Sequence, residues 1–397
     1  MIARAHNYKG VAGLWLAFPV QAWTHVSENY RMELIHKCSK SGLQVMLIRG
    51  LGTERDCAER EVLEAGVPLA LSHRAVWAKH LFRLDPWFLL VRDASGRACA
   101  GIAIENVPTR AMPGHLILRL GKFGGSLPVE VCRVALEALT SIVKKGPRIL
   151  WLQVNVLSRN GREEIARILE NLGFREVIPP SSYRYTLVID LKPSEDEILA
   201  SLGKTARKRI RDTMKLSLRS VVITDLACAE KLKELQQEAL RRTGGHTPSE
   251  DWRGILKMSL EHPNLSRVLG LFQGDEMTPD NMVAFGWVCN HGDHGEYRAA
   301  GSKRTETRIP FGFLLVWDMI RWAKETGAEW FDMGGVTLAE GDETALEGIS
   351  EFKRHFSREV VEVGAEWVLE PAPVRAKIAN VVSNSAQRMR DWVGNQH

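Results

Sequence analysis

The strongest constraint on the fold is an order of predicted elements that occurs twice along the chain. Residues 88–191 and residues 269–369 each read as a hairpin, a strand, a helix, a strand, a helix and a final strand, on the rule that period 2 predicts strands and period 3.6 predicts helices. The two copies end alike, with NLGFREV at 171–177 and HFSREV at 355–360. An internal duplication of one α/β unit is the first fold to test. The alternative is a coincidence between two ordinary α/β units.

The predicted elements of the two copies can be set side by side. The first copy has strands at 88–92, 98–105, 116–120, 149–154 and 183–191, and helices at 129–143 and 161–172. The second copy has strands at 269–272, 281–289, 296–302, 330–333 and 359–369, and helices at 311–324 and 343–356. Each final strand is expected to close its own unit. Two more helices, at 228–242 and 249–260, separate the copies.

Length and composition agree with this organisation. The chain has 397 residues, which favours two or three domains, and its 45% hydrophobic and 25% charged residues are ordinary for a globular protein. A whole-chain rod or disordered protein is therefore excluded. We expect four regions. They are a first unit at 1–192, a basic helix with connecting helices at 193–264, a second unit at 265–370 and a helical tail at 371–397.

Cysteine usage and hydropathy indicate the compartment. The six cysteines are scattered without close pairs, which favours reduced thiols over a disulfide framework. The apolar run at 11–23 is too short to span a bilayer, and the PVQA segment that begins at Pro19 within it makes a poor signal-peptide cleavage site. We therefore expect a cytoplasmic protein with no transmembrane segment; peripheral contact with a membrane stays open.

Residues 204–219 form the densest charge run in a chain whose net charge is only +5. The run holds one acid, Asp212, and seven bases, which are Lys204, Arg207, Lys208, Arg209, Arg211, Lys215 and Arg219. At helical spacing, Ala206, Ile210 and Met214 share a stripe beside a row of cations. Such a row suits phosphate or nucleic acid. The alternative is a solvated basic face, but such a face usually carries balancing acids.

Four stretches of the sequence resemble the FemABX family of aminoacyltransferases, within the GNAT-like acyltransferases. They are 190–211 (a DLKP segment running into KTARKRIR), 314–336 (WAKETGAEWFDMGGV at its end), 348–356 (GISEFKRHF) and 169–174 (LENLGF). Any one of them is a weak motif, whereas four in order are more specific. The family's glycine after FKxxF is Ser357 here, and no long helical insert is present.

The resemblance implies a fold and an activity. The fold would be α/β (α+β), with two tandem GNAT-like units, each a mixed sheet flanked by helices. The protein would move an aminoacyl group from aminoacyl-tRNA to an amine of a phosphate-bearing peptidoglycan precursor or a related acceptor, without a cofactor. Two alternatives stay open: an acyl-CoA-dependent N-acyltransferase of the same fold, and a non-catalytic nucleic-acid-binding protein.

The resemblance also implies roles for individual residues. Lys353 of the FKxxF match would stabilise the oxyanion of the tetrahedral intermediate, and Phe352 would flank the terminal nucleotide of the donor. Lys204, Arg207 and Arg211 match basic positions that bind phosphate, and Lys208 lies in the same row. From the residues alone, the aromatic pair at 352 and 356 could equally be core, with Lys353 a surface charge.

Two further segments belong to the expected site. Asp332 to Gly335 (DMGG) ends a predicted strand. Gly334 and Gly335 would allow positive φ or close backbone approach and are expected to bind substrate; the alternative is a plain tight turn. Asp332 could accept a proton or anchor the loop. Arg308 belongs to a loop before the helix at 311–324, where many GNAT enzymes hold the CoA pyrophosphate on backbone amides. The usual QxxGxG/A pattern is absent there, which argues against CoA binding by the second unit.

Two loops have weaker signals. The glycine-rich segment 121–126 could hold phosphate with Lys122, or be a flexible connection. The turn 291–295 (HGDHG) hints at a metal, but turn chemistry is the commoner origin of such a pattern. The sequence contains no GxSxG, Walker or HExxH motif, and we expect no metal site.

Overall fold

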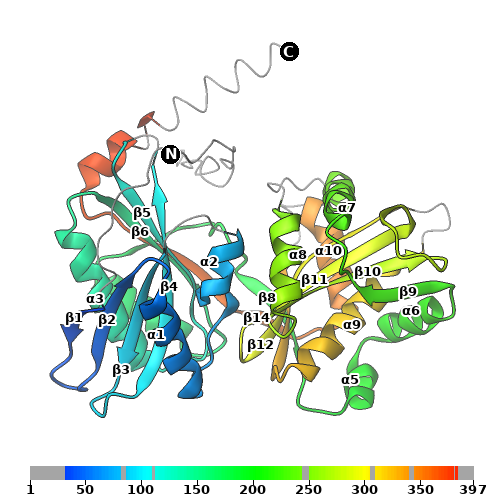
Figure 1. Ribbon diagram of the computed structural model, residues 1–397, viewed down its shortest axis with the longest axis horizontal. Coiled ribbons are helices and arrows are strands. Elements are labelled where there is room, and N and C mark those ends of the chain that lie inside the picture. The colour runs from blue at the N-terminus through cyan, green and yellow to red at the C-terminus, as the bar shows by residue number, and fades with distance from the viewer. Residues whose placement is uncertain are drawn as a thin grey trace, which may run out of the picture.

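The chain forms two α/β halves that lie side by side, each built on one sheet (Figure 1). The computed structural model describes residues 32–81, 86–109, 112–243, 250–304, 309–338, 344–379 and 381–382. In hydrogen-bonded order, the first sheet contains β1 (Glu33–Lys37), β2 (Gln44–Arg49), β3 (Trp87–Arg92), β4 (Ala98–Pro108), β5 (Leu116–Gly124), β6 (Ile149–Leu157), β15 (Gly364–Leu369) and β7 (Arg175–Glu176). The second contains β14 (Val360–Glu362), β8 (Tyr185–Asp190), β13 (Trp330–Val336), β12 (His294–Ser302), β11 (Met282–Asn290), β10 (Ser266–Gln273) and β9 (Leu218–Val222).

Helices cover both sheets. The first half of the chain contributes α1 (Thr53–Glu64), α2 (Ala75–Leu81), α3 (Val129–Lys145) and α4 (Arg162–Asn171). The second half contributes α5 (Glu195–Ser201), α6 (Lys204–Met214), α7 (Cys228–Thr243), α8 (Trp252–Glu261), α9 (Phe311–Glu325) and α10 (Thr344–Arg354). In the described part of the chain, no helix is both long and apolar enough to cross a bilayer.

The predicted duplication is confirmed by the strand order. In each half an antiparallel run leads into a central parallel pair, β5 with β6 and β12 with β13. One long helix connects the strands of each pair, α3 in the first half and α9 in the second. The apolar positions of these helices face inward, because Val134, Leu139, Leu315 and Ile320 are almost completely buried. The fold is therefore α/β, with two alike units.

The two units exchange their last strands. The strand predicted at 183–191 forms as β8, but it lies in the second sheet between β13 and β14. The strand predicted at 359–369 is divided, and its larger part, β15, lies in the first sheet between β6 and β7. The prediction that each final strand closes its own unit is thus wrong. Alternation in a sequence indicates a buried strand but does not identify its partners. The domain boundaries at 192 and 265 stay a prediction.

The early segment around α2 packs with the second half. Trp77 of α2 stacks on Trp287 of β11, with ring centroids 6.3 Å apart. Both belong to one apolar core that also includes residues of α7 and α8. The six cysteines are all free thiols. The predicted basic helix is shorter than expected, since it ends at Met214 and Leu218–Val222 pairs with β10 as β9.

Candidate functional site

Lys353, the lysine that the resemblance identifies, is a buried residue at the end of β13. It lies in the last turn of α10 with only 7% of its surface exposed. Its Nζ donates a 2.8 Å hydrogen bond to the carbonyl of Gly335 and lies 5.5 Å from the centroid of the Tyr297 ring. A Cβ at Gly334 would lie 3.3 Å from this Nζ, and Gly334 has φ of 71°. Gly334 thus has the positive φ that the sequence analysis allowed for, and a binding role of the two glycines toward substrate stays a prediction. The alternative that Lys353 is a surface charge is wrong.

Asp332 anchors this turn. Its side chain is fully buried. Thr186 Oγ1 and the Gly334 N–H donate to Oδ1 at 2.5 Å and 2.7 Å, and the Tyr183 hydroxyl donates to Oδ2 at 2.8 Å. Both carboxylate oxygens are therefore engaged in holding the strand end. Of the two roles left open from the sequence, this geometry favours the anchor.

The charge of Lys353 depends on two opposing effects. Burial lowers its pKa to about 8, and the nearby carboxylates of Asp332 and Glu296 act in the opposite direction. The ammonium form therefore predominates at neutral pH. One of its three N–H groups is used by Gly335, which leaves donors for another acceptor.

Phe352 and Phe356 pack away from the lysine, onto α9. Their rings lie 4.9 Å and 5.3 Å from the ring of Phe313. Phe356 is buried, and Phe352 is half-buried beside Gly312 in the first turn of α9. The aromatic residue beside Lys353 Nζ is instead Tyr297. Arg308, also expected at the site, lies outside the described residues.

A buried polar network crosses from the first unit to this site. Glu296 of β12, 2% exposed, accepts from Lys122 Nζ of β5 at 3.0 Å. Its Oε2 lies 3.0 Å from His291 Nε2. The Tyr183 hydroxyl lies 3.3 Å from Oε1, the oxygen that Lys122 contacts. Since Tyr183 also donates to Asp332, the network runs from Lys122 to the strand end where Lys353 lies.

Within this network the protonation states are settled by burial and pairing. Burial opposes ionisation of Glu296, but Lys122 and His291 hold its pKa well below the usual value. Burial lowers the pKa of His291 to about 3. The Leu71 N–H donates to His291 Nδ1 at 3.2 Å, so the Nε2 proton must face Glu296. Burial and the two carboxylates raise the pKa of Tyr183 well above 10, so it stays a phenol.

Lys122 has a backbone conformation that points to a constrained site. It is the one non-glycine residue of the described chain with positive φ, at 45°. Such strain is kept where the surroundings enforce it, and here β5 also changes its register against β6 between Leu120 and Phe123. Lys122 is paired with Glu296. Its charge is therefore not free to bind phosphate in the glycine-rich loop.

The basic helix α6 begins beside the end of α10. The Gly203 N–H, just before α6, donates to the carbonyl of His355 at 3.0 Å, just after α10. Ala206 and Ile210 are completely buried, as predicted. Met214 is instead 54% exposed and Thr213 takes its inward position.

The predicted cations of α6 face solvent. Lys204, Lys208 and Arg211 are exposed and have no acid within ion-pair distance in the described chain. Arg207 is half-buried, and its guanidinium donates to the carbonyl of Ala200.

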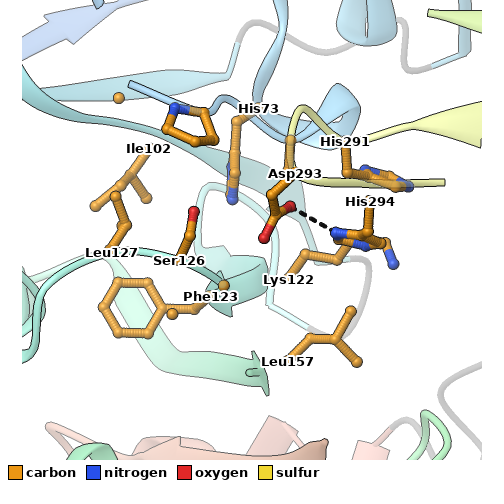
Figure 2. A pocket seen from close by; sticks show the side chains of 15 residues that line it. His73, Ile102, Lys122, Phe123, Ser126, Leu127, Leu157, His291, Asp293 and His294 are labelled. Atoms are coloured by element: carbon orange, nitrogen blue, oxygen red, sulfur yellow. Dashed lines mark hydrogen bonds and ion pairs between the residues drawn. The ribbon is translucent and has the colours of Figure 1, made fainter. Parts of the chain in front are cut away.

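The HGDHG turn uses its histidines for hydrogen bonds. His291 bonds Glu296, and His294 Nδ1 lies 2.7 Å from the Asp293 carboxylate. Figure 2 shows this turn facing the glycine-rich loop across a pocket of about 40 Å³. Elsewhere, His80, Glu261 and His262 bring three ligand atoms within 4.8 Å of one another. Glu261 there is mostly exposed and already paired with His80, so this trio does not by itself mark a metal site.

The residues that sequence reasoning missed are Lys122 as an ion-pair partner, Tyr183, Thr186 and Glu296. None of them had a local signal, since Glu296 lies in a strand that also holds Arg298 and Ser302. Comparison with known proteins finds a family match for part of the chain. A model described as the FemAB family matches residues 275–384, which carry β11 to β13, α9 and α10.

One of the solved structures compared, that of FemX, shows the same fold over most of the chain. The structure of FemX matches with a TM-score of 0.65 and 13% identity, over 83% of this chain and 99% of that one. The L-PGS structure from Bacillus licheniformis reaches 0.48 with 14% identity, over 85% and 97%. A tandem GNAT protein from the clavulanic acid pathway reaches 0.44 with 14% identity, over 83% and 99%. Comparison with curated proteins gives no match.

The fold is thus a pair of alike α/β units. Residues 275–384 match the FemAB family model, and the fold is similar to that of FemX, which agrees with the resemblance read from the sequence. The family match supports an acyl- or aminoacyltransferase.

Proposed function

We propose that this protein transfers an aminoacyl group from aminoacyl-tRNA to an amine of a peptidoglycan precursor or a related acceptor, in the cytoplasm. The observation that carries the proposal is the buried ammonium of Lys353 at the glycine-rich end of β13. A buried cation with free donors is suited to a negative charge that develops during reaction.

The chemistry asks for little more than orientation and charge stabilisation. The acceptor nitrogen attacks the ester carbonyl, and the carbonyl oxygen becomes an oxyanion. Collapse of the tetrahedral intermediate breaks the C–O bond to the ribose, whose oxygen takes up the proton that the amine loses. Lys353 donates a hydrogen bond to the oxyanion, while Asp332 keeps the glycine turn in place.

The donor's phosphates would lie along α6. The helix presents Lys204, Lys208 and Arg211 without acidic partners in the described chain, and its first residue is next to the end of α10. A polyanion bound along this row would thus have one end close to Lys353. Binding of this kind depends strongly on salt.

The two alternatives differ in the donor they need. An acyl-CoA enzyme would use the first turn of α9 for the pyrophosphate, and there Phe352 lies against Gly312, with a ring atom 3.1 Å from the Cβ position. This favours tRNA over CoA. A non-catalytic nucleic-acid-binding protein would not need a buried lysine at a strand end.

One assay separates these functions. The protein is incubated with a peptidoglycan precursor and either a mixture of charged tRNAs or acetyl-CoA, and the acceptor is analysed by mass spectrometry. We expect a mass gain of one amino-acid residue with charged tRNA alone. A gain of an acetyl group would support the acyl-CoA alternative, and tRNA binding without any product would support the non-catalytic one.

A further inference from the structure

Exposed apolar side chains gather on a helix that follows β15. Residues 373–379 are helical, and so are 381–382; we call these residues the tail helix. Val374 is 73% exposed, Ile378 51%, Val381 58% and Val382 44%. No other helix among the described residues has more than one large apolar side chain in this exposed class. A cluster of exposed apolar side chains indicates a surface that binds a partner.

The four exposed side chains form one stripe along the tail helix. At 3.6 residues per turn, positions 374, 378, 381 and 382 lie on the same side. The opposite side packs on the protein, because Ala376 and Ala379 are almost completely buried. The Arg375 guanidinium donates to the carbonyl of Pro147, between α3 and β6. The tail helix, orange-red in Figure 1, is thus attached to the first half of the molecule with its apolar stripe turned outward.

Unbalanced positive charge borders this stripe. Lys145 and Arg148 lie on either side of the Pro147 contact, and Lys377 lies on the tail helix itself; all three are exposed. None of the three has an acid within ion-pair distance among the residues that the structure describes. The segments 144–148 and 371–382 contain no acidic residue. Glu370, which directly precedes the second segment, lies 3.8 Å from the Arg175 guanidinium.

The charge beside the stripe indicates what covers it. A second copy of the chain would bring two sets of cations together, and the repulsion between like charges opposes such a dimer. An aliphatic helix face with basic residues beside it is instead typical of helices that lie in the interface of a membrane. Anionic lipid headgroups attract such residues, while the apolar side chains enter the boundary between headgroups and acyl chains.

We propose that the tail helix binds the surface of a bilayer that contains anionic lipids. The helix lies parallel to the membrane plane and does not cross it, with the apolar stripe inserted and the bordering cations on lipid phosphates. Its attachment at Pro147 then holds the first half of the molecule at the membrane. The assignment does not depend on the transfer reaction proposed above, since it rests on a different surface.

The test is flotation of the full-length protein with vesicles of phosphatidylcholine, with or without about 30 mol% phosphatidylglycerol. We expect binding to the anionic vesicles to be at least about tenfold stronger than binding to the neutral ones. Val374→Gln/Ile378→Gln should weaken binding to the anionic vesicles by about tenfold or more, because it removes half of the stripe. Leu63→Gln/Leu260→Gln is the matched control on α1 and α8, where these leucines are 40% and 38% exposed, and it should leave binding within about twofold.

A second pair of variants tests the cations. Lys145→Glu/Arg148→Glu should also weaken binding to the anionic vesicles by about tenfold or more, and raised salt should then have a smaller effect than on the wild type. Lys233→Glu/Arg241→Glu makes the same change of net charge on α7 and should leave binding within about twofold. Circular dichroism and urea unfolding check that each variant is folded.

Three results would overturn the assignment: equal or no binding of the wild-type protein to the two kinds of vesicle, undiminished binding by Val374→Gln/Ile378→Gln, or a dimer in sedimentation velocity that this variant abolishes. Binding lost in Lys208→Glu/Arg211→Glu but kept in Lys145→Glu/Arg148→Glu would instead assign the lipid contact to α6. Should the stripe variant fail to fold, the comparison of vesicles with the wild-type protein and the cation variants still decides. No tRNA or turnover is involved, so failure of the transfer assay and failure of this one are distinguishable.

Discussion

The Nζ atom of Lys353 occupies space beside Gly334 that a larger side chain at position 334 would fill. Lys353 Nζ lies 3.3 Å from the position of a Cβ at Gly334, and it bonds the next carbonyl along the strand. The ammonium is thus fixed against main chain, with side-chain carboxylates farther away. Such a cation is held in place before a substrate arrives, which is the condition for effective stabilisation of a transition state.

Removing this cation should affect reaction rather than folding. We expect Lys353→Met, which keeps the length of the side chain without its charge, to lower kcat/KM by about 100-fold or more, the scale for one oxyanion donor. Lys324→Met is a matched control, because Lys324 also donates to main-chain carbonyls, those of Leu191 and Pro193. Steady-state kinetics with circular dichroism as a folding check would test this, and near wild-type activity of the variant would remove Lys353 from the mechanism.

The lowered pKa of Lys353 predicts a pH dependence. The ammonium form is present below its folded pKa of about 8 and is lost above it, so oxyanion stabilisation should fall by up to about tenfold per pH unit beyond that value. Ionisation of the acceptor amine acts in the opposite direction. The informative measurement is therefore the ratio of wild-type to Lys353→Met rates from pH 6 to 10, which we expect to decline above about 8. A constant ratio would contradict the assignment.

At the scale of elements, the row of cations on α6 begins next to the end of α10, the helix that carries Lys353. The Gly203–His355 hydrogen bond joins the start of one helix to the end of the other. A side chain at Gly203 would meet the His355 carbonyl at 2.4 Å, so this contact requires a glycine. The cation row is consequently fixed relative to the turn that holds Lys353.

Reversing charges on α6 should weaken binding of tRNA and reduce its dependence on salt. We expect the double variant Lys208→Glu/Arg211→Glu to lower the slope of log K against log salt concentration by about 2, because each phosphate contact contributes about one. Lys233→Glu/Arg241→Glu on α7 makes the same change in net charge away from α6. Fluorescence anisotropy at several salt concentrations would measure both. An unchanged slope in the α6 variant would show that this face of α6 is only solvated and does not contact phosphates.

Prediction from sequence succeeded where the signal was local. The apolar spacing of α3 and α9 and the alternation of β4 are properties of consecutive residues, and these elements formed where expected. Lys353, Asp332 and the glycine pair, all expected at the site, lie next to one another, while their roles stay predictions. Tyr183 and Glu296 were missed because their contact joins residues 113 positions apart, and no periodicity encodes such a pairing. The same reason explains why the partners of β8 and β15 could not be predicted.

At the scale of the whole molecule, each unit is incomplete without a strand from the other. β15 contributes the buried Ala365 and Trp367 to the first core, and β8 contributes Leu187 to the second. The ion pair between Lys122 and Glu296 adds a buried polar link across the halves. The two sheets therefore behave as parts of one folding unit.

Separate expression of the halves tests this dependence. We expect residues 1–192 alone and residues 193–397 alone to lack cooperative unfolding, since the first loses the strand between β6 and β7, and the second the strand between β13 and β14. Buried apolar side chains of these strands are each worth about 1.5–3 kcal/mol. Co-expression of both fragments should restore a cooperative transition in urea. Independent cooperative unfolding of either fragment would show that the exchange is dispensable.

The same exchange imposes an order on synthesis at the ribosome. In the first sheet, β6 lacks β15 as its second neighbour until Gly364–Leu369 has been translated. This happens long after the other strands of that sheet have emerged. Throughout that interval the nascent polypeptide exposes a strand edge open to pairing with other chains. A premature stop codon late in the message would therefore damage the part of the protein that was made first.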